Sequence, residues 1–212
     1  MAGPHLPGGA EAFTVVSVTW EDVPVWYHAY CTHPHATTAT TFAQGWGNTR
    51  FAPISCPDGS PVHTYYAASS FASAVMESLF HDLPLRPPGV FDLDRLKHFR
   101  LARLTIPDPI QCVSFHTPHL PALDLTRADL IDSLPAVYDS TRKWSQAAYD
   151  QCPGAQAIAY GSRRDDSGRC VMLFGQRLPS SRLTVVSDES MAVDPLRTKV
   201  LQLADSLRLN VI

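Results

Sequence analysis

Glu77 is the first candidate for a catalytic residue, because a carboxylate on the flank of a helix can stabilise a developing cation or orient a sugar hydroxyl. It lies beside an apolar stripe formed by Phe71, Val75 and Leu79, one turn before His81. The same spacing also fits a solvated helix residue that pairs with His81, a contact worth only a few tenths of a kcal/mol. The spacing alone leaves both interpretations of Glu77 open.

Two adjacent tyrosines, Tyr65 and Tyr66, end a predicted strand just before that helix. Successive strand residues point to opposite faces of a sheet, so we expect one ring in the core and the other in a cleft or in solvent. A tyrosine ring in a cleft can stack on a flat base or on a nicotinamide ring. As an isolated pair, two adjacent tyrosines are more often structural than part of a binding site.

Arg50 and Ser162 are candidates for binding a phosphorylated ligand. Arg50 lies in a glycine-bearing loop between Trp46 and Phe51, and a guanidinium group suits bidentate phosphate recognition. Ser162 follows an apolar strand and precedes two arginines, where its hydroxyl can bind a phosphate or a ribose, or cap a turn. The segment lacks the G-x-S-x-G pattern of a nucleophile elbow, so we do not expect Ser162 to act as a nucleophile.

Motifs for metals and for nucleotide-binding loops are weak or missing. Cys31, His33 and His35 superficially resemble a metal cluster, but they lack a convincing second pair of ligands, so we expect no metal site. Neither the phosphate-loop nor the dinucleotide glycine fingerprint occurs. The chain is therefore not expected to be a Rossmann or P-loop enzyme.

The elements that must position these residues are short, because eighteen prolines and eleven glycines interrupt the chain. After a loose tail over residues 1–12, we expect a single α+β domain over residues 13–212. Strands are predicted where β-branched and aromatic residues cluster, and helices where apolar residues recur at helical spacing. The predicted strands are 13–20, 25–31, 62–66, 101–106, 110–115, a hairpin of 155–160 and 170–174, and 183–187; the predicted helices are 67–82, 125–134, 139–149 and one that begins at Asp194-Pro195.

Composition narrows the class of protein. The 212 residues carry a formal net charge of −3, which argues against a surface dedicated to nucleic acid or to an anionic membrane. The chain has no run of eighteen apolar residues and no signal-peptide pattern, and its five cysteines are scattered. We therefore predict a cytoplasmic protein with reduced thiols.

The order of the motifs resembles the RES-domain family, the toxin component of RES–Xre toxin–antitoxin systems. Tyr27-His28 stands where that family has an aromatic residue and an arginine, and Thr49-Arg50-Phe51 stands at its Gly-Arg-aromatic loop. Tyr66-Ala67-Ala68, followed by Glu77, is similar to a Tyr-x-Ala segment whose tyrosine lies eleven residues before a helical glutamate. A late Gly-x-x-Tyr-x-Ser-Arg segment is matched by Gly154 to Arg163.

The resemblance is strongest over residues 25–178 and implies a mixed β-sheet split around an NAD cleft, as in ADP-ribosyltransferases. It implies cleavage of the nicotinamide–ribose bond by phosphorolysis or hydrolysis, with NAD as substrate and no further cofactor. The implied catalytic residues are Glu77 at the oxocarbenium-like ribose, Tyr66 near nicotinamide and His28 at the ribose. The implied NAD-binding residues are Arg50 at the pyrophosphate, Ser162 at a phosphate or ribose oxygen, and Phe51 together with His28 and Tyr66.

His28 departs from the family pattern, because the resemblance places an arginine there. A His-Tyr-Glu set is similar to that of the diphtheria-toxin class of ADP-ribosyltransferases, so the acceptor of ADP-ribose stays open: phosphate, water or a macromolecule. A catalytically degenerate NAD-binding or interaction module is a further alternative. The implied protein partner is an Xre-type antitoxin, and a second copy of the chain is another candidate.

Overall fold

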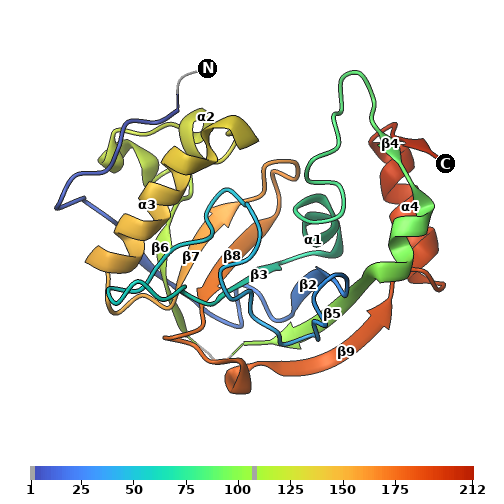
Figure 1. The fold of residues 1–212 in the computed structure, drawn as a ribbon, viewed down its shortest axis with the longest axis horizontal. Helices are drawn as coiled ribbons and strands as arrows, with labels where there is room; N and C mark the ends of the chain where they lie inside the picture. The colour runs from blue at the N-terminus through green and yellow to red at the C-terminus, as the bar shows by residue number, and fades with distance from the viewer. Residues whose placement is uncertain (1–2, 107–108) are drawn as a thin grey trace.

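The computed structural model describes residues 3–106 and 109–212, and an eight-stranded mixed sheet forms its centre (Figure 1). The strand order is β1-β6-β7-β8-β3-β2-β5-β9, in which only β6 and β7 run parallel. The prediction of a mixed α/β fold in a single domain is confirmed. The strands are β1 Val15–Val18, β2 Trp26–Cys31, β3 Thr64–Ala68, β5 Phe99–Thr105, β6 Ile110–Ser114, β7 Ala157–Gly161, β8 Arg169–Phe174 and β9 Thr184–Ser190.

The helices predicted at 67–82 and 125–134 are both shorter in the structure. The helices observed are α1 Phe71–Met76, α2 Arg127–Leu130, α3 Tyr138–Gln151 and α4 Leu196–Ser206, with short 3₁₀ helices at Leu93–His98, Leu120–Leu123, Pro135–Val137 and Ser180–Arg182. A small parallel pair that the sequence did not indicate, β4 Val90–Phe91 and β10 Asn210–Val211, lies beside α4.

The prediction of a helix over 67–82 is wrong at both ends. Ala67 and Ala68 belong to β3 and pair with β8, so the helix starts only after Ser70, whose hydroxyl accepts a hydrogen bond from the Ser73 amide. Its regular part ends at Glu77, and the hydroxyl of Ser78 donates to a main-chain carbonyl one turn back, a contact that competes with helix propagation. Glu77 therefore lies at the end of a helix rather than along one.

The prediction for 125–134 is also too long, because only one turn is helical. Thr126 caps that turn through reciprocal bonds with Asp129, and Pro135 follows soon after it. At the C-terminal helix, the N-cap position falls on Pro195 rather than on Asp194. Asp194 still satisfies the helix start, because its carboxylate accepts from the main-chain amide and hydroxyl of Thr198.

Two apolar cores lie on opposite faces of the sheet, as strand alternation requires. In β8, Met172 packs into the core that also holds Trp144 of α3, whereas its neighbours Val171 and Leu173 pack into the other core. Helices α1 and α3 thus cover one face, and a long loop that includes Phe42 contributes to the core of the other.

The sheet opens between β2 and β3. Within the described residues, these two strands are paired only at Tyr27 and Ala68. On their other sides, β2 pairs with β5 along its whole length, and β3 pairs with β8 along its whole length. Beyond that point a side chain takes the place of the main-chain ladder, because the His28 Nδ1 atom lies 2.6 Å from the Tyr66 carbonyl oxygen. The opening between the two strands positions the site described below.

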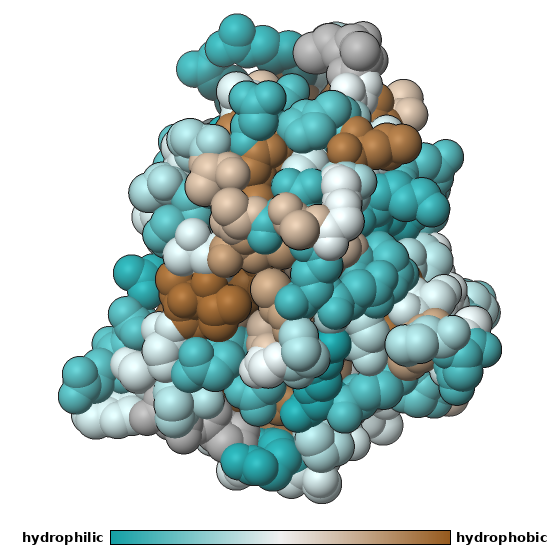
Figure 2. Space-filling view, turned by 90° about the vertical axis from the view of Figure 1, so that its left-hand side faces the viewer, coloured by the Kyte–Doolittle hydropathy of each residue, from teal (hydrophilic) through white to brown (hydrophobic). Residues whose placement is uncertain are grey.

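Residues 3–14, the described part of the chain before β1 and of the predicted loose tail, form no helix or strand but are attached to α3. The Trp144 indole donates to the His5 carbonyl at 2.8 Å, and Gln151 bonds main-chain groups of Gly8 and Glu11. Figure 2 shows this side of the molecule, where hydrophilic residues dominate and apolar ones gather in a strip that runs from the upper part of the view down to its middle. In the described part of the chain, no helix combines the length and apolar character needed to cross a membrane.

Candidate functional site

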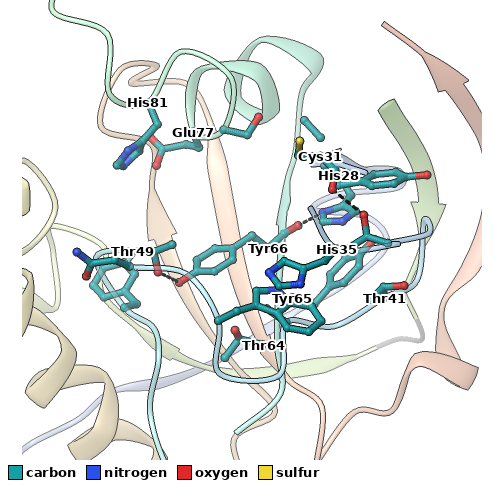
Figure 3. Close-up of a pocket in the computed structure, with 18 of the residues that line it drawn as sticks. His28, Cys31, His35, Thr41, Thr49, Thr64, Tyr65, Tyr66, Glu77 and His81 are labelled. Atoms are coloured by element: carbon teal, nitrogen blue, oxygen red, sulfur yellow. Dashed lines mark hydrogen bonds between the residues drawn. The ribbon is translucent and has the colours of Figure 1, made fainter. Parts of the chain in front are cut away.

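A pocket of about 400 Å³ lies at the opening between β2 and β3 (Figure 3). Its walls come from both strands, from the loop between them and from the turn that follows α1. Five of the six predicted site residues line it: His28, Arg50, Phe51, Tyr66 and Glu77. Segments 49 residues apart in sequence thus meet in one cavity, as the resemblance implied.

Glu77 is held by three groups from two other segments. Its Oε1 atom accepts from the Ser162 hydroxyl at 2.8 Å and from the Arg163 main-chain amide at 2.7 Å. Its Oε2 atom lies 3.5 Å from Arg50 Nη1, and only 11% of the side chain is exposed. Both carboxylate oxygens are therefore engaged, and the charge of Glu77 is fixed in position at the pocket wall.

Ser162 lies behind the pocket rather than in it. The residue is fully buried just after β7, and its Oγ atom also accepts from the main-chain amides of Arg164 and Asp165 at 3.2 Å each. The predicted contact of Ser162 with a ligand is thus replaced by a contact with Glu77. The reason is geometric, because the turn after β7 folds its hydroxyl inward beneath the carboxylate that faces the cavity. Ser162 positions Glu77.

Arg50 is a buried cation, and part of its guanidinium group has no hydrogen-bond partner among the described residues. Its side chain is 3% exposed, and its loop is fastened to α3, where the hydroxyls of Thr141 and Ser145 donate to the carbonyls of Arg50 and Phe51. Within the described residues, the Nε and Nη2 atoms of Arg50 have no hydrogen-bond partner. Because buried N–H groups are almost always paired, this guanidinium is suited to an anion in the pocket.

Tyr65 and Tyr66 point to opposite faces of β3, as predicted, and both contribute to the pocket wall. The Tyr66 hydroxyl lies 2.7 Å from Thr49 Oγ1, and burial raises the pKa of this phenol, so it stays neutral. The Tyr65 hydroxyl donates to the Ala39 carbonyl, and burial raises its pKa too. Each ring is thus fixed by a hydroxyl contact to the loop between β2 and β3.

His28 reaches the pocket from the face of the sheet opposite to the one on which Tyr66 packs. It shares its face of β2 with Trp26 and Tyr30, which pack into the second core, whereas Tyr66 packs against the first. Burial lowers the pKa of His28 to about 4, although the hydrogen bond to the Tyr66 carbonyl opposes this shift. His28 is therefore neutral at physiological pH.

The neutral His28 ring has a defined tautomer and a defined orientation. A carbonyl oxygen only accepts, so Nδ1 carries the proton and Nε2 is left as an acceptor. The ring lies 4.0 Å from the Tyr65 ring and 5.2 Å from the Tyr30 ring, centroid to centroid. Tyr30 in turn donates to both carboxylate oxygens of Asp188 on β9.

The residues considered as a metal cluster line the far end of the same pocket. Cys31 donates through sulfur to the His33 carbonyl, and the His35 ring stacks on Trp46 with centroids 4.1 Å apart. Across residues 3–106 and 109–212, no group of three or more His, Cys, Asp or Glu side chains is placed to hold a metal ion. These side chains instead give that end of the pocket an aromatic wall.

A sequence comparison connects this geometry to a known family, because the RES domain matches residues 25–194. The chain belongs to the RES-domain family. The match extends past the segment of strongest resemblance, includes the five predicted pocket residues and Ser162, and ends just before α4. The β1 strand and α4 lie outside the RES domain.

The RES-domain fold is also seen in a solved structure. The chain resembles one from the crystal structure of the M. tuberculosis MbcT-MbcA toxin-antitoxin complex, with a TM-score of 0.61 and 17% identity, covering 91% of this chain and 92% of that one. At this identity the likeness shows the shared fold. No curated protein matches the chain.

Several residues that hold the site gave no signal in the sequence. Ser145 acts through a hydroxyl contact, and Arg163 acts through its main-chain amide, which any residue type supplies. Thr141 acts in the same way as Ser145, through the contact of its hydroxyl with the Arg50 carbonyl. Such contacts join segments that are far apart along the chain, so no local pattern indicates them.

Proposed function

We propose that this RES-domain protein is a toxin that consumes NAD by cleaving its nicotinamide–ribose bond, as an NAD phosphorylase or glycohydrolase. The observation that carries the proposal is the buried Arg50, which pairs with Glu77 through Nη1 at 3.5 Å, leaves Nε and Nη2 without a hydrogen-bond partner among the described residues, and lines one cavity with Glu77. NAD combines an anionic pyrophosphate with a cationic nicotinamide ring, so it is complementary to such a pair. The cavity volume of about 400 Å³ falls within the usual range of small-molecule sites.

Arg50 would pair with the pyrophosphate through Nε and Nη2, which point to one edge of its planar group. The Tyr66 ring would stack near nicotinamide, since its hydroxyl is held by Thr49. Together these contacts would place the ribose between Tyr66 and Glu77. Phe51 is fully buried, so its part is to shape the wall behind Arg50.

Glu77 would act by charge. When the glycosidic bond breaks, its electron pair goes to the nicotinamide nitrogen, which becomes neutral, and positive charge develops at the ribose. A carboxylate fixed by Ser162 and Arg163 needs no reorganisation to stabilise that charge. Because both of its oxygens are already engaged, Glu77 serves this reaction as an oriented anion.

His28 would contact the ribose through Nε2. The neutral tautomer leaves this atom as an acceptor for a ribose hydroxyl. In this proposal the opening between β2 and β3 is an NAD cleft in an ADP-ribosyltransferase-like fold, and the pairing of the two strands at one position supports it. The similar structure is that of a toxin-antitoxin complex, so we also propose an antitoxin of the Xre type as partner.

The test is nicotinamide release from NAD by the purified full chain. Glu77→Gln keeps the size of the side chain but removes its charge, and we expect the rate to fall at least about 100-fold. Glu189→Gln, the same change at an exposed position on β9, is the matched control and should keep the wild-type rate. Circular dichroism checks that both variants are folded.

Two results would contradict the proposal in different ways. A folded wild-type chain that leaves NAD intact would reject the activity. Full activity in Glu77→Gln would reject only the role of Glu77.

A transferase is the second candidate, because His28, Tyr66 and Glu77 do meet in one pocket. NAD labelled in the adenosine half separates the two functions. Label on a protein or a nucleic acid would indicate transfer, whereas label only in small products would indicate phosphorolysis or hydrolysis.

A further inference from the structure

His81 is a second ionisable side chain at the Glu77 end of the pocket. It lies in the turn after α1, four residues beyond Glu77, and its side chain is 16% exposed. Figure 3 shows its imidazole ring next to the Glu77 side chain, at the end of the pocket opposite His28. Nothing in the roles assigned above uses this ring.

The partners of His81 define which of its nitrogen atoms is basic. Nδ1 lies 2.8 Å from a carboxylate oxygen of Asp82, and Nε2 lies 3.3 Å from the Tyr138 hydroxyl. An ionised carboxylate only accepts, so in the neutral ring Nδ1 carries the proton and Nε2 is the acceptor. A histidine whose far nitrogen is held by a carboxylate has the arrangement of an oriented general base.

The other ionisable groups near Glu77 are committed elsewhere. Both oxygens of Glu77 accept hydrogen bonds or pair with Arg50, and Arg50 is a permanent cation. The carboxylate of Asp82 is 80% exposed and holds His81. His28 approaches the pocket from the opposite face of the sheet. His81 Nε2, whose present partner is the neutral Tyr138 hydroxyl at 3.3 Å, is thus the remaining basic atom on the pocket wall that also carries Glu77.

We propose that His81 is the general base that activates water for attack on the ribose, which makes water the acceptor; this rests on the proposed function. The water oxygen bonds to the anomeric carbon as the bond to nicotinamide breaks, and the electron pair of that bond goes to the nicotinamide nitrogen. One water proton goes to His81 Nε2 and then to solvent. The products are ADP-ribose, neutral nicotinamide and one proton.

The test compares His81→Ala with wild type in phosphate-free buffer, with ADP-ribose formation as the readout. Loss of a general base costs about 100-fold or more, so we expect a drop of that order. Added imidazole should restore much of the lost rate in His81→Ala, because it supplies the missing base, and should not restore Glu77→Gln. His98→Ala, an exposed histidine outside the pocket, is the matched control and should keep the wild-type rate.

Three outcomes would contradict the role of His81 without contradicting the proposal that the protein consumes NAD. These are an unchanged rate in His81→Ala, a loss in the folded variant that imidazole does not restore, and a wild type that consumes NAD only when inorganic phosphate is supplied. A wild type that consumes no NAD under either condition would instead reject the proposed function, and this inference with it.

Discussion

The Glu77 side and the His28 side of the pocket hold their key residues by different means. Glu77 is an ion fixed by an arginine, a hydroxyl and a main-chain amide from two other segments. His28 is a neutral ring fixed by one carbonyl and by two tyrosine rings. The Glu77 side thus depends on a carboxylate whose charge is compensated by Arg50, whereas the His28 side depends on an imidazole ring that stays neutral.

This difference separates what each side contributes. An oriented carboxylate can stabilise a cation that forms during a reaction, whereas a neutral imidazole offers a hydrogen-bond acceptor without competing for that cation. Removing a partner should therefore damage the Glu77 side most, while acid should damage the His28 side. Variants and changes of pH that act on only one of the two sides test this difference.

The largest effect is expected when the Glu77 side loses its cation. Arg50→Met leaves a carboxylate that is 11% exposed without its counter-charge, and breaking such a buried pair costs about 3–5 kcal/mol in the free energy of unfolding. Urea denaturation measures this loss. Arg169→Met is the control, because its pair with Asp22 is far more exposed and should contribute about 0–1 kcal/mol.

A double variant tests the same ion pair between Arg50 and Glu77. Adding Glu77→Gln to Arg50→Met removes the stranded charge, so part of the lost stability should return. Equal losses in Arg50→Met and Arg169→Met would show that the Arg50–Glu77 pair is not the charge-compensated centre described above.

Acid is expected to destabilise the His28 side. The pKa of His28 is about 4 in the folded protein, against about 6.5 in an unfolded chain, so the unfolded state binds more protons between these values. Stability is thus complete above about pH 6.5 and falls as the pH drops toward 4. For His28 alone, the free energy of unfolding should decrease by about 2 kcal/mol between pH 7.5 and 5.

The measurement is urea denaturation at both pH values in wild type and in His28→Gln. Burial also lowers the pKa of His116, so part of the acid effect should remain in the variant. The difference between the two proteins isolates His28. If both lose the same stability on acidification, the histidine is not buried in its neutral form.

The smallest of the three effects concerns the hydroxyl behind Glu77. Ser162→Ala removes one of the two hydrogen bonds to Oε1, and we expect turnover of NAD to fall about tenfold, equivalent to about 1.4 kcal/mol, with little change in KM. Steady-state kinetics measures this, with Ser206→Ala on α4 as the matched control. A raised KM with unchanged turnover would instead place Ser162 in contact with NAD.

Much of the local structure could be predicted from the chain. The hairpin of β7 and β8 and the opposite orientations of Tyr65 and Tyr66 follow from strand alternation, and the structure confirms them. The short helices α1 and α2 were predicted too long, because apolar spacing continues past the residues where strand pairing and side-chain contacts stop the helix. The β4–β10 pair was missed, since two residues per strand leave no pattern.

The sequence by itself determined the order of the motifs, and with it the RES-domain family and five of the residues around the pocket. Only the tertiary structure decided that His28 and Glu77 approach the pocket from opposite faces, that Ser162 lies behind Glu77, and that His81 stands beside it. The physical reason is that alternation fixes the face of each residue within a strand, whereas the opening between β2 and β3 depends on contacts between distant segments.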